Sequence, residues 1–261
     1  MGLGKRSRSL ARSGFRSVGL VVTRVHDAET NGEVPLWARN ARDERHITAV
    51  LAGCLREDAN CVDVGANLGV ITEQIVRLAP QGRHLAFEPI PHLAAELRRR
   101  FPSVEVHQAA LSDTPGTASF GSVPQALGLS GFRPRVLSEV EVVPIPVEVR
   151  TLDDVVAGAR VDFLKVDVEG AELAVLAGAT ATLSRSRPVV VFEHTRIAFG
   201  ADWSHELGPA DFATSRAIFD LLVGTLDYRL FDLDGQGPLT AGEFEAHYES
   251  GDRFNFLAAP R

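Results

Sequence analysis

Apolar residues recur along the chain in two alternating patterns, which predict strands and helices in turn. Short runs of consecutive apolar residues predict buried strands, and apolar residues three or four positions apart predict helices that cover a sheet. The predicted strands span 61–65, 84–88, 104–111, 161–168, 188–194, 228–234 and 253–258. The predicted helices span 43–57, 67–78, 92–100, 151–157, 171–183 and 211–226. This order predicts an α/β fold with a doubly wound, mostly parallel seven-stranded sheet that ends in a hairpin.

Two segments depart from the alternation. Residues 113–149 are rich in Pro and Gly, so we expect an insertion of loop and hairpin that overhangs the sheet as a flap. Residues 1–42 carry only basic charges before Asp27 and are predicted to be a basic, partly helical N-terminal extension. Their apolar stretch at 18–22 is too short for a signal peptide. Residues 43–261 are therefore predicted to form one domain that contains the insertion.

Composition narrows the class of protein. The 261 residues are 45% hydrophobic and 23% charged, as in ordinary globular domains. A formal net charge of −7 disfavours a general nucleic-acid binder. No apolar run approaches the ~18 residues of a transmembrane helix. Cys54 and Cys61 are too few for a disulfide framework, and we expect buried thiols in a cytoplasmic protein.

Candidate chemistry begins where the first predicted strand ends, at 63–69 (DVGANLG), directly before a helix. Glycines there allow a tight turn and a close approach to a bound molecule. Glu88 ends the second strand and can accept hydrogen bonds from ribose hydroxyls. Asn67 replaces the second glycine of the dinucleotide fingerprint, and Asp63 adds a negative charge that suits a cationic ligand. The pair of acids therefore favours S-adenosylmethionine over NAD.

Several motifs together resemble one family. The segments VDVGANLGVIT, FEPIP, AALSD, TLDD, FLKVDVEGAE, VLAGA and PVVVFEH occur in the order typical of the FkbM family of class I S-adenosylmethionine-dependent methyltransferases. The resemblance implies methyl transfer to a hydroxyl oxygen of a sugar, glycan or polyketide-type natural product. It also implies a cofactor site whose residues are Asp63, Gly65, Ala66, Asn67 and Gly69 at the methionine part, Glu88 at the ribose and Ala110 or its neighbours at adenine.

The candidate residues for acceptor activation lie at the ends of the fourth and fifth predicted strands. They are Lys165, Asp167, Glu169, Glu193 and His194. Strand alternation places the first three on one face, where Lys165 and Asp167 are spaced to pair, and it points Glu193 and His194 to opposite faces. Either His194 or a carboxylate takes the hydroxyl proton. Alternatively, Asp167, Glu169 and Glu193 hold Mg²⁺ or Mn²⁺, which is not expected because Lys165 already supplies a cation.

Three other interpretations remain open. The spacing of Asp232, Asp234, Gln236, Gly237 and Glu243 matches an EF-hand calcium loop, but the preceding residues alternate like a strand, which favours a strand and a turn. An NAD(P)-dependent oxidoreductase is disfavoured by the incomplete glycine pattern. A non-catalytic S-adenosylmethionine-binding scaffold would bind cofactor without turnover. The expected partner is a small-molecule or glycan acceptor, and the sequence does not indicate an oligomeric state.

Overall fold

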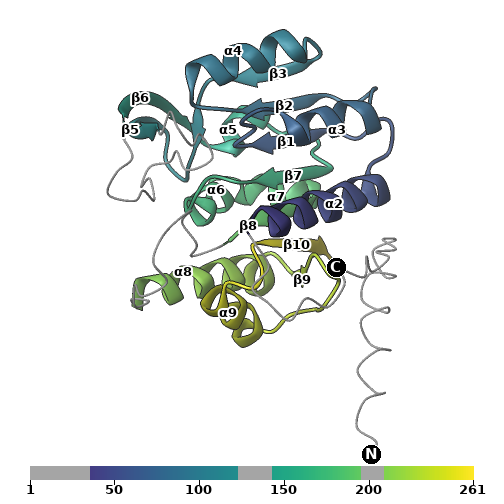
Figure 1. Ribbon diagram of the computed structural model, residues 1–261, viewed down its shortest axis with the longest axis vertical. Helices are drawn as coiled ribbons and strands as arrows, with labels where there is room; N and C mark the ends of the chain where they lie inside the picture. The colour runs from purple at the N-terminus through teal and green to yellow at the C-terminus, as the bar shows by residue number, and fades with distance from the viewer. Residues whose placement is uncertain (1–35, 123–142, 195–208) are drawn as a thin grey trace, which may run out of the picture.

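The computed structural model describes residues 36–122, 143–194 and 209–261, arranged around a seven-stranded sheet (Figure 1). The strand order is β3-β2-β1-β7-β8-β10-β9. The strands are β1 (Cys61–Val64), β2 (His84–Phe87), β3 (Val104–His107), β7 (Phe163–Val166), β8 (Val189–Glu193), β9 (Tyr228–Asp232) and β10 (Asn255–Pro260). β10 runs antiparallel to both of its neighbours, and the pairs from β3 to β8 are parallel. The predicted mostly parallel seven-stranded sheet is therefore confirmed.

Helices cover both faces of this sheet (Figure 1). One face packs against α2 (Leu36–Cys54), α3 (Val70–Leu78) and α4 (Pro91–Arg100). The other packs against α5 (Leu152–Val156), α6 (Glu172–Ala177), α7 (Thr180–Ser186), the α8 helix (Pro209–Phe219) with its π-helical continuation η2 (Asp220–Thr225), and α9 (Ala241–Ser250). Strand residues alternate between the two apolar cores: Val62 and Val64 pack on the second face, and Cys61 on the first.

A second, smaller sheet interrupts the alternation and has the order β4-β6-β5. Its strands are β4 (Ala110–Leu111), β5 (Gly116–Ser122) and β6 (Val143–Arg150), of which β5 and β6 pair antiparallel. Phe120, Val147 and Val149 pack with Ile90 and Leu93 at the start of α4. The predicted hairpin is therefore present. Residues 123–142, in the middle of the predicted flap, lie outside the described residues, as does 1–35 of the N-terminal extension.

Four predicted elements differ from the structure. The strand expected at 104–111 is divided, because β3 pairs with β2 whereas β4 pairs with β6. The helix expected at 171–183 is two helices separated at Gly178, where a Cβ atom would lie 2.1 Å from the carbonyl oxygen of Ser112. The helix expected from residue 43 begins at Leu36, and the turn expected after β9 contains α9.

Charged side chains fasten α2 to the end of β9 and the start of β10. Asp234, just after β9, pairs with Arg42 of α2 and accepts Arg253 Nη2 at 2.9 Å. Arg253 Nε also donates to Asp232 Oδ2 at 3.1 Å, and the Asp232 side chain is fully buried. This network fixes the position of α2 over the sheet.

None of the helices in the described ranges is long and apolar enough to cross a membrane. Both cysteines are free thiols; Cys61 is buried as expected, whereas Cys54 is half-buried, and the burial it has raises the pKa of its thiol to about 12.

We expect Arg253→Met to lower the free energy of unfolding by about 3 kcal/mol, because it leaves the buried Asp232 carboxylate without its cation. Arg216→Met is the matched control, since Arg216 of α8 forms an exposed pair with Asp220 of η2 and the loss of this pair costs about 0.5 kcal/mol or less. Urea denaturation of both variants measures the difference. Equal losses would contradict the structural role of Arg253.

Candidate active site

The first predicted cofactor segment forms a tight turn between β1 and α3. Gly65 has a φ of 77°, and the backbone N–H groups of Gly65 and Ala66 both donate to the carbonyl oxygen of Phe87 at 3.0 Å. A Cβ atom on Gly65 would lie 1.8 Å from the carbonyl oxygen of Asp167, at the end of β7. The ends of β1, β2 and β7 meet at this turn, and because they lie so close together only glycine fits at position 65.

The rest of the turn also requires left-handed backbone. Asn67 and Gly69 have φ values of 46° and 79°. A Cβ atom on Gly69 would lie 2.6 Å from the ring of Phe101. The Oδ1 atom of Asn67 is covered and has no hydrogen-bond donor among the described residues. A bound molecule with a donor group would satisfy it.

Glu88 directly follows β2 and is only 4% exposed. Its Oε2 atom accepts the backbone N–H of Asn67 at 2.8 Å, and its Oε1 atom accepts that of Ile90 at 2.9 Å. Burial raises the pKa of this carboxyl to about 7, and the two backbone donors only partly offset the rise. Each oxygen retains a lone pair for a further donor, so the carboxylate suits a pair of ribose hydroxyls.

Asp63 lies beneath the turn rather than on its open side. It is buried, and its Oδ2 atom accepts the hydroxyl of Thr72 on α3 at 2.6 Å. It lies opposite Lys165 in the register of β1 and β7. Burial raises the pKa of Asp63, although Thr72 and the Lys165 ammonium act against the rise. Ala110, predicted near adenine, is buried in the apolar cluster between α4 and the small sheet.

The structure brings four of the five predicted acceptor-activating residues together. Lys165 Nζ donates to Asp167 Oδ2 at 3.0 Å; the Lys165 side chain is 2% exposed and that of Asp167 is 39% exposed. Carboxylate oxygens of Asp167, Glu169 and Glu193 lie within 4.8 Å of one another. We call Lys165, Asp167, Glu169 and Glu193 the acid cluster. Its oxygen ligands are of the type that a divalent ion accepts.

The carboxyls of the acid cluster differ in their affinity for protons. Burial raises the pKa of Glu193 well above its usual range, and the neighbouring negative charge of Asp167 adds to the rise. Burial also acts to raise the pKa of Asp167, but Lys165 and a hydrogen bond with Glu193 outweigh it and bring the pKa below its usual value. Asp167 is therefore the ionised member and Glu193 the one poised to exchange a proton.

His194 lies on the opposite face from Glu193, as strand alternation predicts. Its ring is 3% exposed, bonds the hydroxyl of Ser215 on α8 at 2.8 Å, and stacks on Tyr248 of α9 with ring centroids 4.4 Å apart. The structure therefore does not bring His194 together with the acid cluster. These contacts indicate a structural role for His194, which packs between α8 and α9.

One residue beside the acid cluster, Asn255, is absent from the predicted site. Asn255 begins β10 and lies opposite Glu193 in the antiparallel register, and its Nδ2 atom donates to Asp43 Oδ2 on α2 at 3.1 Å. The sequence signal was a polar residue at an inward position of an otherwise apolar strand. This signal could not place Asn255 near the candidate site until the pairing of β10 with β8 was known.

The calcium-loop interpretation is not supported by the structure. Asp232 and Asp234 pair with arginines, and the Glu243 side chain accepts the backbone N–H of Thr240 at 2.8 Å in the capping box of α9. These contacts engage the three carboxylates structurally. Asp232 serves as the buried partner of Arg253, and Glu243 caps the N-terminus of α9.

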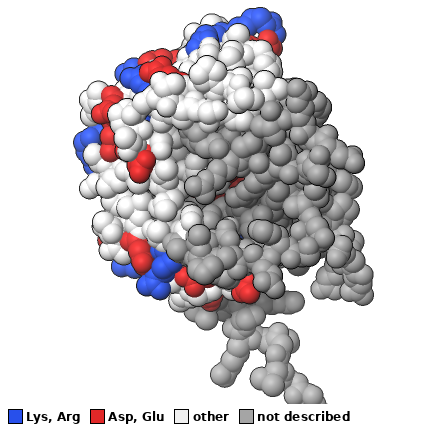
Figure 2. All heavy atoms as spheres, turned by 90° about the vertical axis from the view of Figure 1, so that its left-hand side faces the viewer, with Lys and Arg blue, Asp and Glu red and all other residues white. Residues whose placement is uncertain are grey.

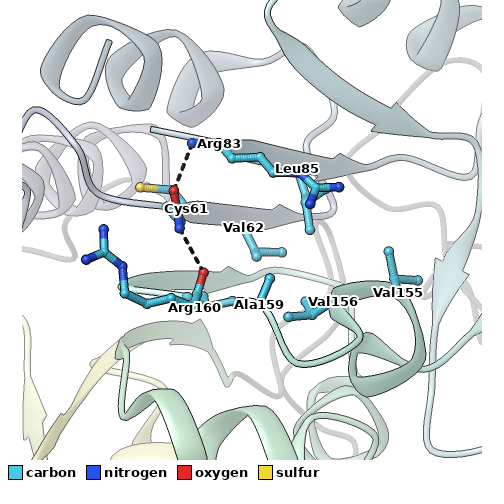
Figure 3. A pocket seen from close by; sticks show the side chains of 10 residues that line it. Cys61, Val62, Arg83, Leu85, Val155, Val156, Ala159 and Arg160 are labelled. Atoms are coloured by element: carbon cyan, nitrogen blue, oxygen red, sulfur yellow. Dashed lines mark hydrogen bonds between the residues drawn. The ribbon is translucent and has the colours of Figure 1, made fainter. Parts of the chain in front are cut away.

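A small pocket opens at the other edge of the sheet, where β1, β2 and β7 begin (Figure 3). Leu85, Val62, Val156 and Arg160 are among its lining residues. Its cavity volume of about 30 Å³ is far below the about 300–1,000 Å³ typical of ligand sites. A nucleoside cofactor does not fit there, so the turn at the opposite edge remains the candidate.

On the face drawn in Figure 2, basic and acidic side chains are interspersed over the coloured surface.

Two curated proteins resemble parts of the chain. It is 31% identical over 183 residues to the AMB antimetabolite synthetase AmbE of Pseudomonas aeruginosa, an alignment that covers 54% of this chain and 9% of that protein. It is 32% identical over 161 residues to the 2-O-methyltransferase NoeI of Sinorhizobium fredii, covering 55% of this chain and 65% of that protein. The chain thus spans less than two thirds of the length of either relative.

A solved structure and a family model also match. The crystal structure of a methyltransferase FkbM from Methylobacillus flagellatus KT aligns with a TM-score of 0.47 and 17% identity, over 78% of this chain and 44% of that one. The model of the methyltransferase FkbM domain matches residues 63–230, which include the glycine turn, Glu88 and the whole acid cluster. Because this match spans more than half of the sequence, the chain belongs to the FkbM methyltransferase family.

Proposed function

We propose that the protein is an S-adenosylmethionine-dependent O-methyltransferase that acts on a hydroxyl group of a sugar, glycan or polyketide-type natural product. The observation that carries the proposal is the buried Glu88 carboxylate beside the left-handed glycine turn, in a chain of a methyltransferase family. One relative, NoeI of Sinorhizobium fredii, is a 2-O-methyltransferase, which supports oxygen as the accepting atom.

The residues at the turn fit the proposed cofactor. Glu88 would hold the ribose hydroxyls, and the Oδ1 atom of Asn67 is a free acceptor for a cationic amino group. Gly65 and Gly69 allow the left-handed turn and its close packing against Asp167 and Phe101, which shapes the segment where the methionine part would lie. Ala66 completes the turn through its N–H, and Asp63 contributes negative charge from beneath. When bound, S-adenosylmethionine supplies an electrophilic methyl group on a sulfonium.

The acid cluster would prepare the acceptor oxygen. We propose that Glu193, in its ionised form, takes the hydroxyl proton as the oxygen forms its bond to the methyl carbon. Asp167 and Glu169 keep the site negative and raise the basicity of Glu193. Lys165 balances part of this charge through its 3.0 Å contact with Asp167. One positioned base suffices for such a transfer.

A divalent metal is the alternative means of activation. Asp167, Glu169 and Glu193 would hold it, and it would lower the hydroxyl pKa. The buried Lys165 ammonium, 3.0 Å from Asp167 Oδ2, already reduces the repulsion among these carboxylates. We therefore propose a side-chain base without a metal.

The direct test is incubation with labelled S-adenosylmethionine and a panel of glycans and macrolides, read by mass spectrometry. Methyl incorporation on an oxygen supports the proposal. Cofactor binding without incorporation into any member would favour a non-catalytic scaffold. Binding of NAD in place of S-adenosylmethionine would favour an oxidoreductase.

Cofactor affinity should depend on pH through Glu88. The neutral acid accepts hydroxyl donors poorly, so S-adenosylhomocysteine should bind up to about tenfold more tightly at pH 8 than at pH 6, as the carboxyl ionises through its pKa of about 7. Binding near pH 6 should also release a proton. Calorimetry in buffers of different ionisation enthalpy measures both effects, and Glu88→Gln should remove them. A pH-independent affinity in the wild type would exclude this role.

Glu193→Gln should lower kcat by about 10²–10⁴-fold on the identified acceptor, the contribution typical of a general base. The wild-type rate should rise with pH as Glu193 loses its proton. Asp167→Asn removes the adjacent negative charge, so the surviving rise should move to lower pH. Initial rates against pH for the three proteins decide the assignment. A Glu193→Gln variant within fivefold of the wild type would refute it.

Exhaustive chelation should leave the rate of the wild-type protein unchanged. The readout is methyl incorporation after treatment with EDTA and dialysis, followed by addition of Mg²⁺ or Mn²⁺. An inactive stripped protein that recovers with either ion would replace the side-chain base by a metal held in the acid cluster.

A further inference from the structure

Resting on the proposed function, we propose that Asn255 is a specificity-determining residue, which binds a second hydroxyl of the acceptor adjacent to the one that is methylated. The acceptor would then be a compound with hydroxyls on neighbouring carbons, such as a sugar ring. Neither the family match nor the sequence patterns assign a role to this residue.

The strand register places Asn255 in line with the acid cluster. Asn255 lies directly opposite Glu193 in the antiparallel pair of β8 and β10. Val166 lies beside Phe192 in the parallel pair of β7 and β8, so Asp167 and Glu193 are the next neighbours. Residues paired across neighbouring strands project from the same face. Asp167, Glu193 and Asn255 therefore form one row across three strands.

The orientation of the Asn255 carboxamide is fixed from the side of α2. Its Nδ2 atom donates to Asp43 Oδ2 at 3.1 Å, and the reversed amide would place two acceptor oxygens together. The Oδ1 atom is therefore the free end. This atom is covered, and the part of the chain that the structure describes offers it no hydrogen-bond donor.

Because buried polar atoms are normally hydrogen-bonded, we expect the Oδ1 atom of Asn255 to accept a donor from a bound molecule. Neighbouring strands lie about 4.7–4.9 Å apart, so Glu193 and Asn255 present two acceptors at a spacing that two hydroxyls on adjacent carbons can both reach. The hydroxyl at Glu193 would lose its proton and accept the methyl group. The one at Asn255 would keep its proton and orient the acceptor. A site built this way rejects a molecule that lacks the second hydroxyl.

The test combines a substitution that removes the carboxamide of Asn255 with acceptors that lack one hydroxyl. Methyl glycosides of hexoses are compared with their deoxy analogues, which lack one hydroxyl each, using wild type and the nearly isosteric Asn255→Leu. The wild type should prefer the complete glycoside at least tenfold in kcat/KM. The variant should lose this preference, chiefly through a higher KM for the complete glycoside, with the deoxy analogue unaffected.

Several outcomes would overturn the inference. Equal slowing on both acceptors, or a lower Tm with the preference intact, would show that Asn255 is structural and that an ordered water serves its oxygen. Failure of every glycoside to react or bind, in protein that binds S-adenosylhomocysteine by calorimetry, would reject the acceptor class and leave the cofactor proposal standing. Failure to bind S-adenosylhomocysteine would instead refute the proposed function.

If Asn255→Leu does not fold, competition calorimetry with the wild type loaded with S-adenosylhomocysteine decides the question. The complete glycoside should then bind at least tenfold more tightly than the analogue that lacks the second hydroxyl. Equal affinities would overturn the inference.

Discussion

The contact between Gly65 and the carbonyl oxygen of Asp167 is the constraint on which the site depends. A Cβ atom at Gly65 would overlap that oxygen at 1.8 Å, and the N–H of Asp167 donates to the carbonyl of Val64 at 3.0 Å. β1 and β7 therefore end side by side with nothing between them. This closeness sets the turn proposed for the cofactor directly against the carboxylate row proposed for the acceptor, as a direct transfer between two bound molecules requires.

Charge balance is the second condition of this arrangement. Lys165 is buried between Asp63 on β1 and Asp167 at the end of its own strand, and burial, which lowers the pKa of a lysine, is outweighed by these carboxylates and Glu193. The lysine therefore stays positive and holds Asp167 ionised. Glu193, the next residue in the row, keeps its proton more tightly because it is buried and because the negative charge of Asp167 adds to this effect. Burial of Glu193 and the contact of Asp167 with Lys165 thus give these neighbouring carboxyls different proton affinities.

The sequence predicted the parts of the fold that local pattern controls. Short apolar strands ending in Gly65 or Glu88 could be recognised because buried parallel strands are continuously hydrophobic. Strand alternation also separated Glu193 from His194 correctly. The burial of His194 against Ser215 and Tyr248 could not be foreseen, because α9 lies where glycines indicated a turn. Asn255 was missed for a related reason: its neighbours are set by the antiparallel insertion of β10 beside β8, a long-range pairing that leaves no local signal.

A crystal structure of the protein with S-adenosylhomocysteine tests the central claim most directly, because it locates the cofactor relative to both halves of the site. The account predicts the ribose hydroxyls on the Glu88 carboxylate, the amino acid part along the turn from Gly65 to Gly69, and the sulfur facing Asp167 and Glu193. A nucleoside bound at another edge of the sheet, or a sulfur directed away from these carboxylates, would contradict it.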